Sequence, residues 1–256
     1  MRDVFFIDNQ TGWAVGTNGT IIHTSDGSDT WTPQTSGVTN EVKAVHFINN
    51  TTGWASGGPI PTFLLKTTDG GANWTALTPP STFGSGQDVF FVDENTGYAI
   101  SDSIYRSIDG GTTWFGESYG FGITGVFSLK KVYAINDSIA FVAGRNNAST
   151  NQPVATVFDR RPQSLPNPIW GSAGVTEFQT SYFDIDVLTF ADEFTGFAAG
   201  FPGSTVYRME SDGINYNGPW NVNYELDTTN QNIQSITFPT HPFRALVLRA
   251  GYRAMP

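Results

Sequence analysis

The sequence predicts an all-β chain, a β-propeller of about six four-stranded blades, the last of which is incomplete. The phrase VFFIDNQTGWAVG begins at Val4 and returns in related form at Val45, Val89 and Leu188. A second phrase, TTDGGANW at 67–74, has close copies in the first and third repeats. Short strand-like phrases that repeat along a chain are typical of propellers, in which each repeat is one blade.

Aligning the phrases gives six repeats, at intervals of 41 to 56 residues, which start near Val4, Val45, Val89, Val132, Leu188 and Ile236. Four strands are expected in each repeat, illustrated in the first by VFFID, WAVG, IIHTS and the stretch that begins at Trp31. β-Branched and aromatic residues alternate along these stretches, and Gly, Asn and Asp interrupt them every few residues. We expect one domain over 1–256, because a single repeat cannot bury a core alone.

The last repeat is short. After ALVLR at 245–249 only the third-strand phrase GYRAM and Pro256 remain. We therefore expect an incomplete last blade, which either has three strands or is completed by a strand from another chain.

The second phrase predicts a tight turn held by an Asp side chain, which accepts backbone N–H bonds. Glycine supplies a backbone conformation that other residues resist, and the tryptophan packs between blades. In the first copy Ser28 stands in the glycine position. The residues expected to have this structural role are Asp26, Trp31, Asp69, Gly71, Trp74, Asp109, Gly111 and Trp114.

This turn resembles the Asp-box, or bacterial neuraminidase repeat. Together with the phrase VFFxDxxTGWAxG, it is similar to the photosystem II stability/assembly factor family of propellers. The resemblance covers about residues 1–115 and, less fully, 180–215. It implies a propeller fold and an assembly factor as one possible function, although the same repeat also occurs in secreted and viral proteins.

Composition excludes several classes of protein. The net charge of −10, with only 13 Lys and Arg, provides no basic surface for nucleic acid. No Cys is present, and no apolar run is long enough to span a membrane. The N-terminal stretch MRDVFFID leads directly into the first strand and has no signal-peptide pattern. Since charged residues are only 14%, the polar, uncharged surface favours an extracellular, periplasmic or virion-surface location.

No catalytic residues, metal site or cofactor are predicted. The three histidines have no metal-ligand spacing. A sialidase-like or other glycoside-hydrolase enzyme is an alternative, because distant carboxylates can meet at the mouth of a propeller. The arginines available to a sialidase-like site are Arg106, Arg208 and Arg253, and they share one position of the repeat with His23 and Lys66. A basic residue that recurs at one position indicates a structural role, such as pairing with turn carboxylates like Asp8 or Asp93.

The variable connections indicate where a partner binds. First-to-second and third-to-fourth strand turns are near-copies, whereas the second-to-third connections and those between repeats vary, so all variation falls on one face. Candidate binding residues there are Pro59, Ile60, Pro61, Arg145, Arg160, Arg161, Trp170, Tyr182 and Phe183. Trp170 is alternatively the displaced turn tryptophan of the fourth repeat.

The predicted function is a non-catalytic binding or scaffold module that docks a protein or a glycan through this face. A virion component, such as a capsid decoration or tail adhesin, is an alternative. An assembly factor of the photosystem type and a glycan-cleaving enzyme are the others.

Overall fold

The computed structural model describes eleven stretches of the chain: 1–59, 61–117, 127–137, 139–146, 154–160, 184–192, 195–201, 205–210, 221–227, 233–237 and 247–250. The chain divides into two compact units, Met1–Glu117 and Ser118–Pro256, which we describe separately. The single domain expected from the sequence stays a prediction.

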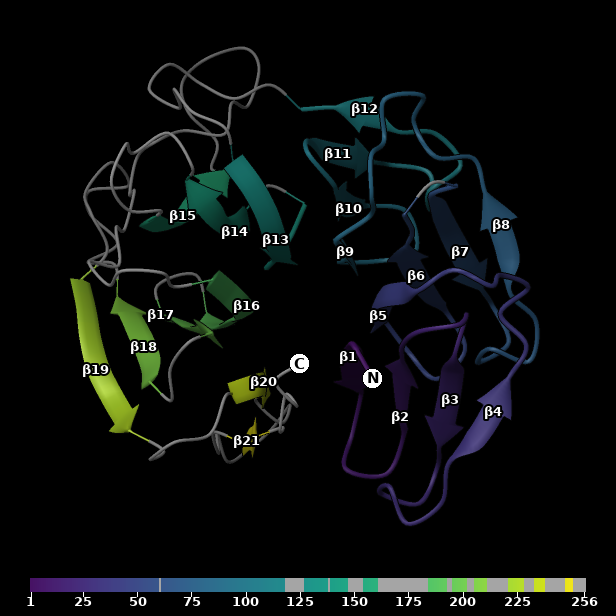
Figure 1. Cartoon of the computed structure of the whole chain (residues 1–256), viewed down its shortest axis with the longest axis horizontal. Helices are drawn as coiled ribbons and strands as arrows, with labels where there is room; N and C mark the ends of the chain where they lie inside the picture. Colours follow the sequence, from purple (N-terminus) through teal and green to yellow (C-terminus); the bar gives the residue numbers. More distant parts are fainter. Residues whose placement is uncertain are drawn as a thin grey trace. The chain divides into compact units, whose positions relative to one another are not determined.

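The described residues of the first unit form three four-stranded antiparallel sheets, each with its strands in chain order (Figure 1). The first sheet contains β1 (Asp3–Phe6), β2 (Gly12–Val15), β3 (Ile21–Thr24) and β4 (Thr32–Gln34). The second contains β5 (Val42–Phe47), β6 (Gly53–Gly57), β7 (Phe63–Thr67) and β8 (Thr75–Leu77). The third contains β9 (Asp88–Phe91), β10 (Gly97–Ile100), β11 (Ile104–Ser107) and β12 (Phe115–Gly116).

The described residues of the second unit continue the pattern. One sheet contains β13 (Phe127–Ala134), β14 (Ala140–Asn146) and β15 (Val154–Arg160). The next contains β16 (Asp184–Asp192), β17 (Thr195–Phe201), β18 (Thr205–Glu210) and β19 (Asn221–Asp227). A further pair contains β20 (Ile233–Thr237) and β21 (Val247–Ala250).

The predicted fold class is confirmed: the described chain is all-β and its sheets are propeller blades. Each repeat start lies in the first strand of a sheet, for instance Val45 in β5 and Leu188 in β16. The end of the last repeat, on which the incomplete blade and its completion by another chain depend, lies outside the described residues.

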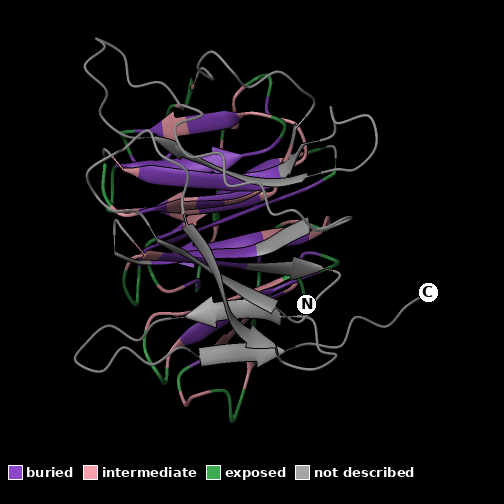
Figure 2. Ribbon diagram, turned by 90° about the vertical axis from the view of Figure 1, so that its left-hand side faces the viewer, coloured by how far each residue is buried: buried purple, intermediate pink, exposed green. Residues whose placement is uncertain are grey.

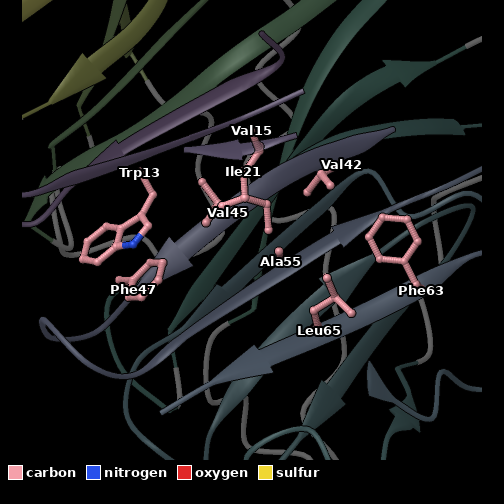
Figure 3. Packing of buried hydrophobic residues seen from close by; sticks show 9 residues of the cluster. All are labelled: Trp13, Val15, Ile21, Val42, Val45, Phe47, Ala55, Phe63 and Leu65. Atoms are coloured by element: carbon pink, nitrogen blue, oxygen red, sulfur yellow. The ribbon is translucent and has the colours of Figure 1, made fainter. Parts of the chain in front are cut away.

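Neighbouring sheets of the first unit pack face to face through apolar side chains. The second and third strands of these sheets are largely buried, whereas the outermost strands β4, β8 and β12 are exposed or half-buried, and many other exposed residues lie in turns and loops (Figure 2). Between the first and second sheets, Trp13, Ile21, Val45, Phe47 and Leu65 belong to one buried cluster (Figure 3). A second cluster, which includes Trp54, Leu64, Val89 and Phe91, joins the second sheet to the third.

Aromatic stacking orients each sheet on the next. Trp13 of β2 stacks on Phe47 of β5, with ring centroids 3.5 Å apart and planes at 9°. Trp54 of β6 stacks in the same way on Phe91 of β9, at 3.7 Å and 4°. In the second unit Phe141 of β14 stacks on Phe190 of β16 at 3.8 Å. One aromatic ring from a second strand therefore meets one from the next sheet's first strand in each case.

The first strands of the three sheets in the first unit lie side by side (Figure 1). On them His46 packs between Phe5 and Phe90, with ring centroids 4.8 Å and 4.0 Å away. Its Nδ1 accepts the backbone N–H of Phe91 at 3.2 Å. Burial lowers the pKa of His46 to about 3, because a protonated ring would lose its hydration. The imidazole is therefore neutral in the folded chain.

This histidine predicts loss of stability in mild acid. The unfolded chain takes up the proton near pH 6.5, whereas the folded chain does so only near pH 3, so acidification favours unfolding over that window. Between about pH 7 and pH 5, the free energy of unfolding should fall by roughly 2 kcal/mol. The variant His46→Asn keeps an acceptor for Phe91 and cannot titrate, so its stability should fall much less over this range.

Urea unfolding at a series of pH values measures this effect. The matched control is His23→Asn, since His23 is only half-buried and its pKa is also lowered by burial. That variant should keep most of the wild-type slope. An unchanged slope in His46→Asn would show that His46 does not cause the acid sensitivity.

Candidate binding surface

The repeated Asp-Gly turns connect the third strand to the fourth in each sheet of the first unit. Asp69 accepts the backbone N–H of Asn73 at 2.9 Å, the Asn73 side-chain amide at 2.7 Å and the Thr67 hydroxyl at 2.8 Å. Asp26 and Asp109 make the equivalent bonds within their own turns. The carboxylates thus have partners inside the turn, which is a structural role.

These hydrogen bonds favour the ionised carboxylate. The Asn73 side chain and backbone, followed by the Thr67 hydroxyl, lower the pKa of Asp69 to about 2. The Thr30 side chain and backbone do the same for Asp26. Neither group is therefore protonated at neutral pH, as a general acid would have to be.

The glycine position of the turn has two constraints. Gly71 has φ +92°, in the left-handed region, and a Cβ there would lie 2.0 Å from Gln34 Oε1. Ser28 occupies the same position in the first copy with φ +83°, a conformation that costs a non-glycine residue about 1 kcal/mol.

The turn peptides also join neighbouring sheets. Gly110 N–H donates to Asn95 O in the turn of its own sheet, at 2.8 Å. Its carbonyl accepts the indole N–H of Trp54 from the preceding sheet, at 3.0 Å. Gly70 has the same two roles, with Thr51 O as its acceptor and Trp13 as its donor. The turn tryptophan Trp74 likewise reaches the preceding sheet, donating to Gln34 Oε1 at 3.3 Å.

Lys66, which occupies the repeated basic position in the second repeat, does not pair with the turn carboxylates. Lys66 Nζ donates to Gly110 O at 3.2 Å and lies 5.0 Å from the Trp54 ring. Asp8 and Asp93 instead accept backbone N–H groups of their own turns. The expected ion pair is therefore wrong for Lys66, because its ammonium group donates its hydrogen bond to the Gly110 carbonyl instead.

On the opposite side, two non-repeated connections contact each other, and we call them together the two-loop platform. It consists of the described residues 57–59, 61 and 62, from the end of β6 to β7, and of 78–87, between β8 and β9. Thr62 Oγ1 donates to Phe83 O at 3.4 Å across the two loops. The backbones also approach closely, since a Cβ on Gly86 would lie 3.2 Å from the backbone N and O of Gly57.

Side chains and backbone from the segment before and within β5 fix both loops. Asn40 Nδ2 donates to the carbonyls of Pro59 and Pro61, at 3.3 Å and 3.1 Å. Lys43 Nζ donates to Ser85 Oγ at 2.7 Å. Glu41 O accepts the N–H of Gly58 at 3.1 Å. The segment 40–43 therefore has contacts with both loops of the platform.

Loop 78–87 is also held from the third sheet. Phe83 is 7% exposed and packs edge-on against Tyr105, with ring centroids 5.4 Å apart. Tyr105 OH donates to Thr82 O at 2.9 Å, and Gly84 N–H donates to Ser101 Oγ at 3.3 Å. A loop with a buried aromatic anchor and several backbone hydrogen bonds has little freedom, so its exposed side chains are presented in a fixed arrangement.

The structure locates only some of the predicted binding residues. Pro59 and Pro61 are exposed on the platform. Ile60, Arg161, Trp170, Tyr182 and Phe183 lie outside the described residues.

Two predicted binding residues lie in strands rather than in loops. Arg145 is in β14 and Arg160 in β15, where Arg145 pairs with Ala155 and Arg160 with Ala140. They therefore stand at opposite ends of this strand pair, about 16 Å apart along the strands, and the structure does not bring them together.

Asn40, Lys43, Phe83 and Ser85 are not among the predicted binding residues. The sequence signals for this region are the variation of its connections between repeats and the density of Pro and Gly in TPPSTFGSGQ, which indicates an irregular connection. Among the described residues no group of three or more His, Asp and Glu side chains is placed to hold a metal ion. Within the same residues no helix is long and apolar enough to cross a membrane.

The sheets and their turns define the class of protein: a β-propeller of the BNR-repeat type. Residues 1–117 match the model of the photosynthesis system II assembly factor YCF48 family. The chain thus resembles that assembly factor, as the repeated phrases predict. No curated protein matches it.

Solved structures agree on the fold. YCF48 from Cyanidioschyzon merolae is 19% identical with a TM-score of 0.52, over 92% of this chain and 88% of that one. YCF48 bound to D1 peptide is 20% identical over 92% of this chain and 86% of that one, and its TM-score of 0.49 carries no argument about the fold. An ancestral GH74 enzyme is 14% identical with a TM-score of 0.61, over 97% of this chain but 37% of its own. At these identities the similarity concerns the fold alone.

Proposed function

We propose that the chain is a non-catalytic protein-binding module that docks its partner on the two-loop platform. The observation that carries this proposal is the anchoring of two non-repeated loops by Asn40, Lys43 and Phe83. A surface that is ordered before binding loses less conformational entropy when a partner docks. Loops held on a rigid β-scaffold are also a usual place for recognition.

The match of residues 1–117 to an assembly-factor family supports a protein as the partner. A solved structure shows YCF48 bound to D1 peptide. This peptide is therefore a defined first probe for binding by the present chain. The low content of charged residues, 14%, supports an extracellular, periplasmic or virion setting as a further part of the proposal.

A binding titration tests this function. Isothermal titration of the purified chain with the D1 peptide should give saturable binding, and a scrambled peptide should give none. Ser81→Arg, at an exposed platform position, should weaken binding by about tenfold or more, because a bulky charge there blocks a docked chain.

The matched control is Thr75→Arg, which adds the same charge at an exposed position on the outer strand β8. It should change the affinity by less than about twofold. Absence of D1 peptide binding, or equal losses in both variants, would contradict the proposed function.

A further inference from the structure

The connection between β2 and β3 contains the pair Asn18–Gly19, and both residues have left-handed backbone torsions, with φ +58° and +68°. Asparagine is one of the few residues with a side chain that tolerate this torsion. Asn18 is exposed, and its side chain has no hydrogen-bond partner within the described part of the chain. Its amide can therefore rotate toward the backbone nitrogen of Gly19.

This pair contains the atoms for an intramolecular reaction that needs only water. The backbone nitrogen of Gly19, after it loses its proton to solvent, attacks Cγ of Asn18 and forms a cyclic succinimide, while the side-chain nitrogen leaves as ammonia. Water then opens the ring at either of its carbonyl carbons. The product is aspartate, or isoaspartate, in which the backbone runs through the former side chain.

The residue that follows the asparagine decides how easily this ring closes. A side chain there hinders the approach of the nitrogen to Cγ, and glycine has none. Among the described residues Asn18 is the one asparagine that precedes a glycine, whereas the equally exposed Asn50 precedes the β-branched Thr51. In the Asp-Gly turns the acidic side chain is held by hydrogen bonds, as for Asp69.

One hydrogen bond restrains the attacking nitrogen. Gly19 N–H donates to Asn40 O at 2.9 Å, and a Cβ on Gly19 would lie 1.9 Å from Val38 O, so the connection lies directly on segment 38–40. The nitrogen can attack only after this bond has opened. Thr20 N–H bonds Thr17 O at 3.2 Å across the same short turn, so the opening needs to involve only residues 17–20.

We propose that Asn18 is a site of spontaneous deamidation to isoaspartate and aspartate, and that the isoaspartate form loosens the connection that follows β6. Isoaspartate adds a carbon atom to the backbone between positions 18 and 19, so it displaces Gly19 N–H from Asn40 O. The same segment holds the connection after β6, because Glu41 O accepts Gly58 N–H at 3.1 Å. The inference goes beyond the proposed function and does not depend on it.

Peptide mapping by mass spectrometry tests the site, after the full chain has been incubated in mildly alkaline buffer. Electron-transfer fragmentation distinguishes isoaspartate from aspartate. Asn18 should convert at least about tenfold faster than Asn50, the matched internal control, which corresponds to a barrier lower by about 1.4 kcal/mol. Asn18→Gln should leave this peptide unmodified over the same time, because its longer side chain closes a ring far more slowly. Conversion of Asn18 no faster than that of Asn50 would overturn the proposal.

Amide hydrogen exchange tests the structural effect on the isoaspartate form, separated by anion exchange. Gly58 N–H should exchange at least about threefold faster than in the unmodified chain, whereas Gly110 N–H, bonded to Asn95 O in the third sheet, should be unchanged. Asn18→Asp carries the same added charge without the longer backbone, so it should exchange as the wild type does. Unchanged exchange at Gly58, or equal acceleration in Asn18→Asp, would contradict the proposed loosening.

Discussion

Replacement of Trp54 by alanine should lower the free energy of unfolding by about 4 kcal/mol, the usual range for a buried tryptophan. This side chain is 1% exposed and stacks on Phe91. Its N–H bonds Gly110 O, and Lys66 lies over its ring. Alanine removes the stack and the hydrogen bond that join the second sheet to the third, together with the contact of Lys66 within the second sheet.

Denaturant unfolding followed by far-UV circular dichroism measures this loss. Trp54→Phe keeps a ring in the stack and loses only the N–H donor, so it should cost about 1–2 kcal/mol. Trp31→Ala is the matched control, because Trp31 is half-buried and contacts Phe6 edge-on at 5.9 Å. A loss at Trp54 no greater than that at Trp31 would contradict the role of the stack.

The second large effect is expected from Gly97→Ala, which should cost about 3 kcal/mol through overpacking. Gly97 stands opposite Phe91 in the β9–β10 ladder, and a Cβ would lie 2.4 Å from that ring. Phe91 has no room to move, because Trp54 stacks on it and Trp114 contacts it edge-on. The glycine of the repeated phrase is therefore needed for space rather than for a special backbone torsion.

Two comparisons test this explanation. Gly12→Ala places the same methyl group 2.6 Å from Phe6, which is half-buried, so it should cost only about 1 kcal/mol. Phe91→Leu should make Gly97→Ala less costly, with a favourable coupling in the double-mutant cycle. Equal costs at Gly12 and Gly97, or strict additivity with Phe91→Leu, would contradict the steric argument.

The features that sequence predicts well here are local and repeated. The Asp-Gly turn is held by groups within five residues of one another, such as Asp69 and Asn73, so its chemistry is visible in the phrase itself. Strand positions follow from alternation of apolar residues, which is also a local pattern.

The features that sequence does not predict depend on contacts between distant segments. Asn40 holds Pro59 and Pro61 across about twenty residues, and Lys43 meets Ser85 across 42 residues. Nothing in the repeat pattern specifies these pairs, because both loops lie outside it. The contact of Lys66 with Gly110 O depends on distance along the chain in the same way, because Gly110 lies 44 residues further on, in the next sheet.

The links made by Gly70 and Gly110 have a consequence for how such a chain can grow. The first and second repeats each have a tryptophan donor in the second strand, Trp13 and Trp54. The turn carbonyls that accept their N–H groups, Gly70 O and Gly110 O, belong to the second and third repeats. A duplicated repeat would bring both halves of this junction with it, so two identical copies would fit each other without further mutation. The gene segment that encodes one complete repeat is thus a natural unit of duplication.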